Sequence, residues 1–178
     1  MNDADFRLVE ADPQRHAEAV RAIFNDAILH TTALYEYLPW GPERIAEWFA
    51  AKAAGGFPVV AAVDGAERLL GFGSYGVYRA RPAYKYTVEH SVYVAENARR
   101  RGLGRALLAE LVRRARATGL HVLVGGIDAS NVGSIALHRQ LGFEPCGVVR
   151  HAGFKFGRWL DVAFWQLILD TPAAPRDG

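Results

Sequence analysis

A strand, a glycine-rich loop and a long helix follow one another in this 178-residue chain, and this succession constrains its fold most. Residues 87–94 read Thr-Val-Glu-His-Ser-Val-Tyr-Val, a β-branched and aromatic run that predicts a strand. The loop Arg99-x-x-Gly102-x-Gly104 comes next, and an apolar stripe at helical spacing begins at Leu103. Glycines allow close backbone approach, and a helix start presents free N–H donors and a positive dipole end. The segment therefore predicts a phosphate site.

Cationic side chains surround this loop, at Arg99, Arg100, Arg101 and Arg105. The spacing differs from that of a P-loop, because no Gly-Lys-Ser/Thr follows, and it lacks the third glycine of the dinucleotide fingerprint. Taken alone, the loop fits equally well a structural turn with solvated arginines.

Hydrophobic periodicity predicts the remaining elements. Further strands are expected over residues 6–9, 59–63, 69–78 and 121–127, and two more within 145–169 around a loop at 153–157. Helices are expected after Asp12-Pro13, from Pro42, from about Gly104 and over 131–141. The order βααβββαβαββ predicts an α+β fold with a mixed sheet covered by helices.

Composition limits the domain organisation and the classes of partner. Half of the residues (51%) are hydrophobic, enough for one core over 1–170, and the Pro- and Ala-rich residues 171–178 predict a flexible tail. A net charge of +2 is too small to indicate binding to nucleic acid. The sequence contains no apolar run of about 18 residues, so no membrane-spanning segment is expected. The lone Cys146 fits a reducing, cytoplasmic compartment and is expected to be a packing residue.

A second motif lies on the later helix, where Asn131, Ser134 and His138 precede Gly142-Phe143. Together with the loop, this motif resembles the GCN5-related N-acetyltransferase (GNAT) family. That family usually carries Gln/Arg-x-x-Gly-x-Gly/Ala and Asn-x-x-Ser/Ala-x-x-x-Tyr, so His138 stands where tyrosine is common. The resemblance implies the GNAT fold, with a mostly antiparallel sheet of about seven strands, and acetyl-CoA as co-substrate.

A narrower resemblance, over about residues 6–170, is to the phosphinothricin and methionine-sulfoximine N-acetyltransferases. It rests on residues 87–94, on Lys-Phe-Gly-Arg-Trp-Leu-Asp at 155–161, and on Asn-Asp-Ala at 25–27 with Thr-Thr-Ala at 31–33. It implies acetylation of an amino-acid analogue by direct attack in a ternary complex, and a homodimer with residues 153–159 near the partner's acceptor site. The alternatives are another amine, such as a protein N-terminus or a polyamine, or an acyl-CoA-binding module without turnover.

The resemblance also implies which residues hold acetyl-CoA. Pantetheine would pair with the backbone of Val92, Tyr93 and Val94, where an N–H would also polarise the acetyl carbonyl. The pyrophosphate would lie over the loop, at Arg99, Arg100, Arg101, Gly102, Leu103, Gly104 and Arg105. Asn131 and Ser134 would hydrogen-bond the pantetheine or phosphate region, although Asn131 also fits a plain helix N-cap.

Two residues are candidates for proton transfer. Strand alternation places Glu89 on one face with Ser91 and Tyr93, and His90 on the other. Glu89 is the candidate base that takes the proton of the amine; a structural salt bridge to Lys85 or an arginine is the alternative. His138 is the candidate acid for the leaving sulfur, because imidazole titrates near neutrality, and a packed helix histidine is the alternative.

The acceptor is expected to meet cations just before the strand of Glu89. Arg79, Arg81 and Lys85 offer charges for a carboxylate or phosphinate, with surface solvation as an equal alternative. Tyr35 and Lys155 are weaker candidates. No metal is expected, because no metal-ligand spacing occurs among His16, His30, His121 and His151.

Overall fold

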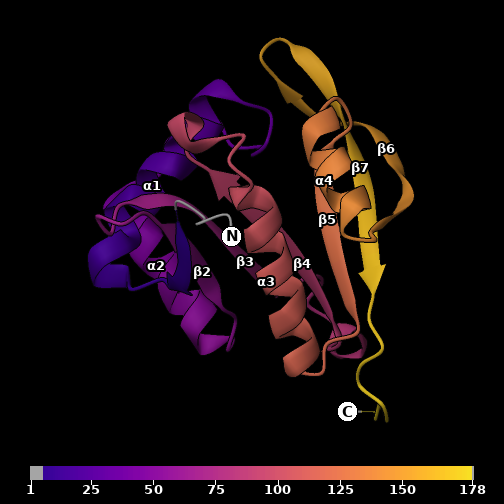
Figure 1. The fold of residues 1–178 in the computed structure, drawn as a ribbon. Coiled ribbons are helices and arrows are strands. Elements are labelled where there is room, and N and C mark those ends of the chain that lie inside the picture. The colour runs from indigo at the N-terminus through magenta and orange to yellow at the C-terminus, as the bar shows by residue number, and fades with distance from the viewer. Residues whose placement is uncertain (1–5, 178) are drawn as a thin grey trace.

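A computed structural model describes residues 6–177 and shows a single seven-stranded sheet flanked by helices (Figure 1). The strands are β1 (Arg7–Glu10), β2 (Val59–Val63), β3 (Leu69–Val77), β4 (Thr87–Val94), β5 (Val122–Asp128), β6 (Glu144–Lys155) and β7 (Arg158–Ile168). The helices are α1 (Pro13–His30), α2 (Pro42–Ala54), α3 (Leu103–Ala117) and α4 (Val132–Gln140), with 3₁₀ turns at Pro82–Tyr84 and Glu96–Ala98. The predicted α+β class and element order are confirmed.

The sheet order is β1-β2-β3-β4-β5-β7-β6, and every neighbouring pair is antiparallel except β4 with β5. Figure 1 shows α1 and α2 with β1–β3 in one half and α4 with β5–β7 in the other, with α3 and β4 between them. The predicted mixed, mostly antiparallel sheet is therefore confirmed. None of the helices formed by residues 6–177 is both long enough and apolar enough to cross a membrane.

Each face of the β1–β4 half is covered by an amphipathic helix layer. On one face, Leu103, Leu107 and Leu111 of α3 are at most 1% exposed and pack in one cluster with Val60 and Leu123. Burying each leucine contributes about 1.5–3 kcal/mol, so the stripe predicted for this helix fixes it to the sheet.

The other face is covered by α1 and α2. Val20 and Phe24 of α1 join Ile45 and Phe49 of α2 around Phe72 of β3. The start of α1 follows the predicted cap, because the Asp12 side chain accepts a hydrogen bond from the backbone N–H of Gln14 at 2.8 Å. This layer ends beside β4 and leaves the same face of β5 and β7 to line a pocket.

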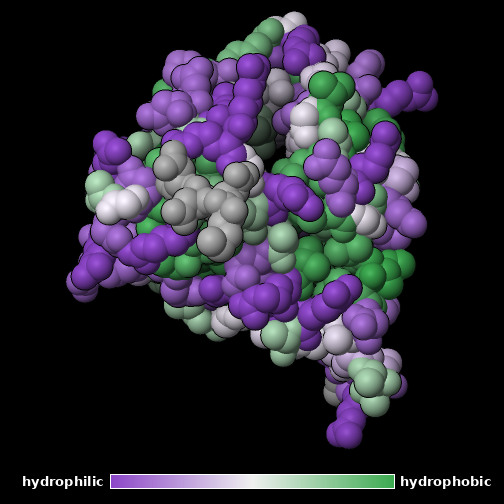
Figure 2. Space-filling model, viewed as in Figure 1, coloured by the Kyte–Doolittle hydropathy of each residue, from purple (hydrophilic) through white to green (hydrophobic). Residues whose placement is uncertain are grey.

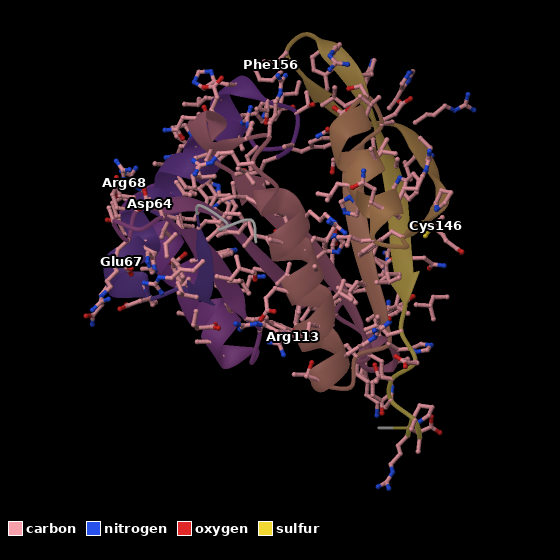
Figure 3. All side chains as sticks on the ribbon, in the orientation of Figure 1. Asp64, Glu67, Arg68, Arg113, Cys146 and Phe156 are labelled. Atoms are coloured by element: carbon pink, nitrogen blue, oxygen red, sulfur yellow. The ribbon has the colours of Figure 1, made fainter. Side chains whose placement is uncertain are left out.

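The expected loop at 153–157 is wrong in extent. β6 continues to Lys155, which pairs with Arg158, so only Phe156 and Gly157 form the turn. Both have positive φ, 50° and 72°, as a tight hairpin of this twist requires. The sequence obscures this turn, because Phe replaces the usual Asn or Asp. Figure 3 shows Phe156 at the hairpin tip and Cys146 on β6 at the outer edge of the sheet.

The segment after β7 makes hydrogen bonds with the body of the protein. Thr171 Oγ1 donates to the carbonyl of Leu120, and Arg176 N donates to the Tyr86 hydroxyl at 3.2 Å. The domain over 1–170 and the flexible tail stay predictions, and residues 1–5 and 178 lie outside the described part of the chain.

Candidate active site

The two central strands diverge, and this creates an open backbone edge. β4 and β5 pair only from Thr87↔Val122 to Glu89↔Val124, although β4 continues to Val94. Over residues 90–94, β4 still pairs with β3 on its other side. In the described residues no strand occupies the opposite edge, so its backbone groups are available for a ligand that hydrogen-bonds like a strand. Val92, Tyr93 and Val94, which are expected to pair with pantetheine, lie on this stretch.

The glycine-rich loop ends at the start of α3, beside the same edge. Gly102 is the N-cap residue with φ 81°, and no side chain caps the helix. Gly104 has a different role: a Cβ there would lie 3.3 Å from Leu137 Cδ2, so this glycine permits the close approach of α4. The uncapped N–H groups and the exposed side chains of Arg99, Arg100 and Arg105 fit an anion.

The side chains of Arg99 and Asn131, both predicted cofactor residues, already contact other parts of the protein. Arg99 forms an ion pair with Asp26 of α1 at 3.5 Å. Asn131 caps α4, because its Oδ1 accepts from the backbone N–H of Ser134 at 3.0 Å. The cap is therefore real, and the Asn131 amide nitrogen keeps two N–H donors for a ligand.

A pocket of about 460 Å³ lies on the α1–α2 side of the diverging strands. It is lined by residues 32–35 and by residues of α2, β3, β4, β5 and β7. Glu89, His90, Ser91 and Tyr93 contribute from β4. The predicted alternation is confirmed by the two clusters, because Tyr93 packs with α1 and α2 whereas Val92 packs with α3. In Figure 2, the surface is hollowed between the half that carries α1 and the half that carries α4. The pocket and the open edge of β4 thus share one strand.

Glu89 lines the pocket in the middle of this strand. It lies opposite Gly76 of β3 and Val124 of β5, and a Cβ at Gly126 would lie 3.3 Å from Glu89 Oε1. Partial burial raises the pKa of Glu89, and the charge of Arg79 lowers it less. Among residues 6–177, no ion pair engages the carboxylate, so the predicted alternative of a structural salt bridge is not formed. The carboxylate is available to accept a proton.

His138 contacts His90, a pairing that sequence reasoning missed. Nδ1 of His138 lies 2.7 Å from the carbonyl oxygen of Ser134, so this nitrogen carries the proton that is donated there. Its Nε2 lies 2.9 Å from Nε2 of His90 and accepts from it when both rings are neutral. Both rings are buried, and burial lowers the pKa of each.

This geometry weighs against His138 as the acid for the leaving sulfur. At neutral pH its lowered pKa leaves one ring proton, and that proton is directed at Ser134. The geometry favours the alternative, in which His138 is a packed helix residue. The role as acid therefore stays a prediction that the hydrogen-bond pattern does not support.

Gly125 makes room for the two imidazoles. A Cβ at this position would lie 2.9 Å from His90 Cε1 and 3.0 Å from His138 Nε2. We expect Gly125→Ala to lower the free energy of unfolding by about 1–3 kcal/mol, because the new methyl group would displace two buried imidazoles that are hydrogen-bonded to each other. Urea unfolding measures it. Gly133→Ala in α4 is the control, since its nearest atom would be 3.7 Å away and no loss is expected. Equal stability of the two variants would contradict the tight packing.

The structure separates the predicted acceptor residues. Tyr35 lines the pocket, and Arg79 lies close enough to Glu89 to affect its pKa. Arg81 and Lys85 are exposed and are not among the lining residues. Lys155 is only 5% exposed and donates to the carbonyls at residues 31 and 34, both at 2.7 Å. Its ammonium group therefore holds the loop that carries Tyr35.

Two charged residues of the lining were not anticipated, Lys52 of α2 and Asp128 at the end of β5. Lys52 follows Ile45 and Trp48 at helical spacing, so periodicity alone would have placed it on the buried face. Asp128 ends a buried strand, where a carboxylate is unusual. Within residues 6–177, no group of three or more His, Cys, Asp or Glu side chains is placed to hold a metal ion.

Comparison with known proteins agrees with this arrangement. The model of the acetyltransferase (GNAT) family matches residues 20–143. The L-methionine sulfoximine/L-methionine sulfone acetyltransferase of Pseudomonas paraeruginosa is 48% identical over 157 residues, 88% of this chain and 91% of that protein.

Two solved structures extend the comparison. An acetyltransferase structure from Acinetobacter baylyi has a TM-score of 0.96 at 53% identity and covers 97% of this chain and 98% of that one. A phosphinothricin acetyltransferase from Sinorhizobium meliloti, in complex with acetyl-CoA, has a TM-score of 0.92 at 36% identity and covers 96% and 92%. Because the family model matches well over half of its length, the chain belongs to the GNAT family of N-acetyltransferases.

Proposed function

We propose that this N-acetyltransferase uses acetyl-CoA to acetylate the amino group of amino-acid analogues such as phosphinothricin, methionine sulfoximine or methionine sulfone. The observation that carries the proposal is the unpaired carboxylate of Glu89, in a pocket that shares its strand with an open backbone edge. The printed activities of the relatives support the substrate class. Acetylation of a polyamine or of a protein N-terminus is the alternative.

In the proposed reaction, Glu89 accepts one proton from the acceptor ammonium, directly or through a water molecule. The freed amine attacks the thioester carbonyl, so that the C–N bond forms and the C–S bond breaks. The attacking nitrogen then loses its second proton, which neutralises the departing CoA thiolate, and the products are the N-acetyl amide and CoA thiol. A backbone N–H on residues 92–94 stabilises the oxygen that becomes negative. The attack is direct, without an acyl-enzyme, and exposed Cys146 on the outer strand β6 has no part in it.

The remaining cofactor contacts belong to the same proposal. The loop at 99–105 holds the pyrophosphate at the start of α3, supported by the left-handed Gly102 and the absence of a side-chain cap. The Asn131 amide and Ser134 hydroxyl face pantetheine or phosphate from the start of α4. Acetyl-CoA is a co-substrate in this scheme, and we expect no metal requirement.

A thiol-release assay separates an enzyme from a binding module. Wild-type protein with acetyl-CoA and methionine sulfoximine is expected to release one thiol for each N-acetyl product, because transfer and CoA release are coupled. The acceptor panel includes spermidine and a short peptide. Tight CoA binding with no thiol release from any amine would favour the non-catalytic module.

We further propose a homodimer in the cytoplasm. Its support is an exposed aromatic group on the β6–β7 hairpin, formed by Phe154, Phe156 and Trp159 with exposures of 46–58%. Trp159→Glu is expected to shift a dimer toward monomer at micromolar concentration, because a charge would be buried in the interface. Sedimentation velocity measures it, with Val132→Glu on exposed α4 as control. A wild-type monomer would contradict the dimer.

A further inference from the structure

The acceptor pocket carries two opposite charges whose roles are not explained by proton transfer at Glu89. Lys52 reaches the pocket from α2, and Asp128 reaches it from the end of β5. Neither residue has an ion-pair partner among residues 6–177. Charged groups that are partly or fully buried without a partner are costly, so their presence in one pocket needs a reason.

Lys52 is fixed at one side of the pocket. Its Nζ donates to the carbonyl of Tyr75 at 2.9 Å and would lie 2.9 Å from a Cβ at Gly76. The rings of Trp48 and Phe57 lie 5.4 and 5.9 Å from the same nitrogen. Burial lowers the pKa of Lys52 to about 8, so the ammonium form still predominates at pH 7. One of its three N–H groups is used, and two remain.

Asp128 is fixed on the other side. It is 6% exposed, and its Oδ1 accepts hydrogen bonds from the backbone N–H and the hydroxyl of Ser130, at 2.8 and 2.6 Å. Oδ2 is buried and has no hydrogen-bond partner. Burial alone would raise the pKa of Asp128, but the hydrogen bonds from Ser130, the nearby hydroxyl of Thr32 and the charge of Arg158 lower it overall. The carboxylate is therefore ionised at neutral pH and has one oxygen unsatisfied.

The three charged groups lie in order across the sheet. Lys52 lies over β3 at Gly76, Glu89 is opposite Gly76 on β4, and Asp128 belongs to β5. A Cβ at Gly126 of β5 would lie 3.3 Å from Glu89 Oε1, and Asp128 follows two residues later, beyond the stretch of β5 that pairs with β4. A small zwitterion with its ammonium above β4 and its carboxylate toward β3 would meet opposite charges at both ends.

We propose that Lys52 binds the carboxylate of the acceptor amino acid and that the negative charge of Asp128 stabilises its ammonium beside Glu89. This inference rests on the proposed function and assigns its selectivity for free α-amino acids. The reverse orientation would bring the acceptor carboxylate against two like charges, at Glu89 and Asp128. It would also remove the ammonium from the base.

The test of Lys52 compares an acceptor that has a free carboxylate with one that lacks it. Methionine sulfone and its methyl ester share the ammonium and the side chain, and only the acid offers a negative charge. Wild-type enzyme is expected to favour the acid at least 10-fold in kcat/KM. Lys52→Met should raise KM for the acid about 10–100-fold, the size of a charge-assisted contact, and change KM for the ester less than about 2-fold.

Controls separate charge recognition from a structural role. Arg15→Met removes an exposed cation at the start of α1, outside the pocket lining, and should leave the acid-to-ester preference unchanged. Lys52→Arg should retain part of the preference, and the affinity for acetyl-CoA should be unchanged in every variant. If Lys52→Met fails to fold, the wild-type ratio and Lys52→Arg still decide the matter.

Substitution of Asp128 is expected to change KM in a different pattern. Asp128→Asn keeps an oxygen for the Ser130 hydrogen bonds but removes the negative charge. It should raise KM for the acid and the ester alike, by about 10-fold, because both carry the ammonium. A wild-type enzyme that acetylates acid and ester equally, or a Lys52→Met variant that weakens both equally, would overturn the inference and leave the proposed function intact. A wild type that acetylates neither would overturn both.

Discussion

Glu89→Gln is expected to lower kcat by about 10²–10⁴-fold, the usual contribution of a positioned general base. Gln has nearly the same shape as Glu, and the side chain forms no ion pair that the change would break among the described residues. It removes only the group that accepts the proton of the ammonium. Steady-state kinetics with a saturating amino-acid acceptor measure the loss, and calorimetry with CoA should show unchanged affinity.

The proposed role of Glu89 also fixes the direction in which the rate changes with pH. Glu89 acts only as a carboxylate, so wild-type kcat/KM should fall as the pH drops through its pKa, which partial burial raises above the usual value. Glu89→Gln should lose that acidic limb and keep the one that belongs to the acceptor amine. Glu47→Gln, an exposed change on α2, is the matched control. Unchanged kinetics in Glu89→Gln would show that another group takes the proton.

Gly102→Val is expected to abolish measurable binding of acetyl-CoA. Gly102 has φ 81°, a conformation that a β-branched residue adopts only under strain, and it places the first N–H groups of α3. Nothing lies within 4 Å of a Cβ there, so the added side chain would enter the open space at the start of α3, where we propose that the pyrophosphate binds. Calorimetric titration with CoA measures the effect.

Gly56→Val separates loss of the phosphate site from backbone strain. Gly56 also has a positive φ, 65°, and an unoccupied Cβ position, but it follows α2, away from the loop. Gly56→Val should lower the free energy of unfolding about as much as Gly102→Val does, and it should leave the affinity for CoA unchanged. If Gly102→Val binds CoA as tightly as the wild type, the loop is only a turn.

Local signals predicted much of the fold. β4 has the predicted bounds, and Asp12 caps α1 as the Asp-Pro pair indicated. The stripe that begins at Leu103 is buried. These features depend on alternation, periodicity and capping, which act within a few residues of the chain. The same signals placed Glu89 and His90 on opposite faces of one strand.

The features that were missed depend on contacts between distant segments. His90 of β4 and His138 of α4 are 48 residues apart and meet only because Gly125 of β5 has no side chain. Lys155 looked like a ligand for the acceptor, but its partners are carbonyls more than 120 residues earlier. The buried, unpaired oxygen of Asp128 could not be predicted, because its burial depends on how β5 packs against the loop at Thr32.

The proposed function is tested most directly by measuring kcat/KM with acetyl-CoA for amino-acid acceptors and for other amines in one assay. We expect methionine sulfoximine, methionine sulfone and phosphinothricin to be acetylated at least 100-fold more efficiently than spermidine or a peptide with a free N-terminus. A tenfold preference corresponds to only about 1.4 kcal/mol, and both charges of the zwitterion contribute. Higher efficiency with the polyamine or the peptide would contradict it.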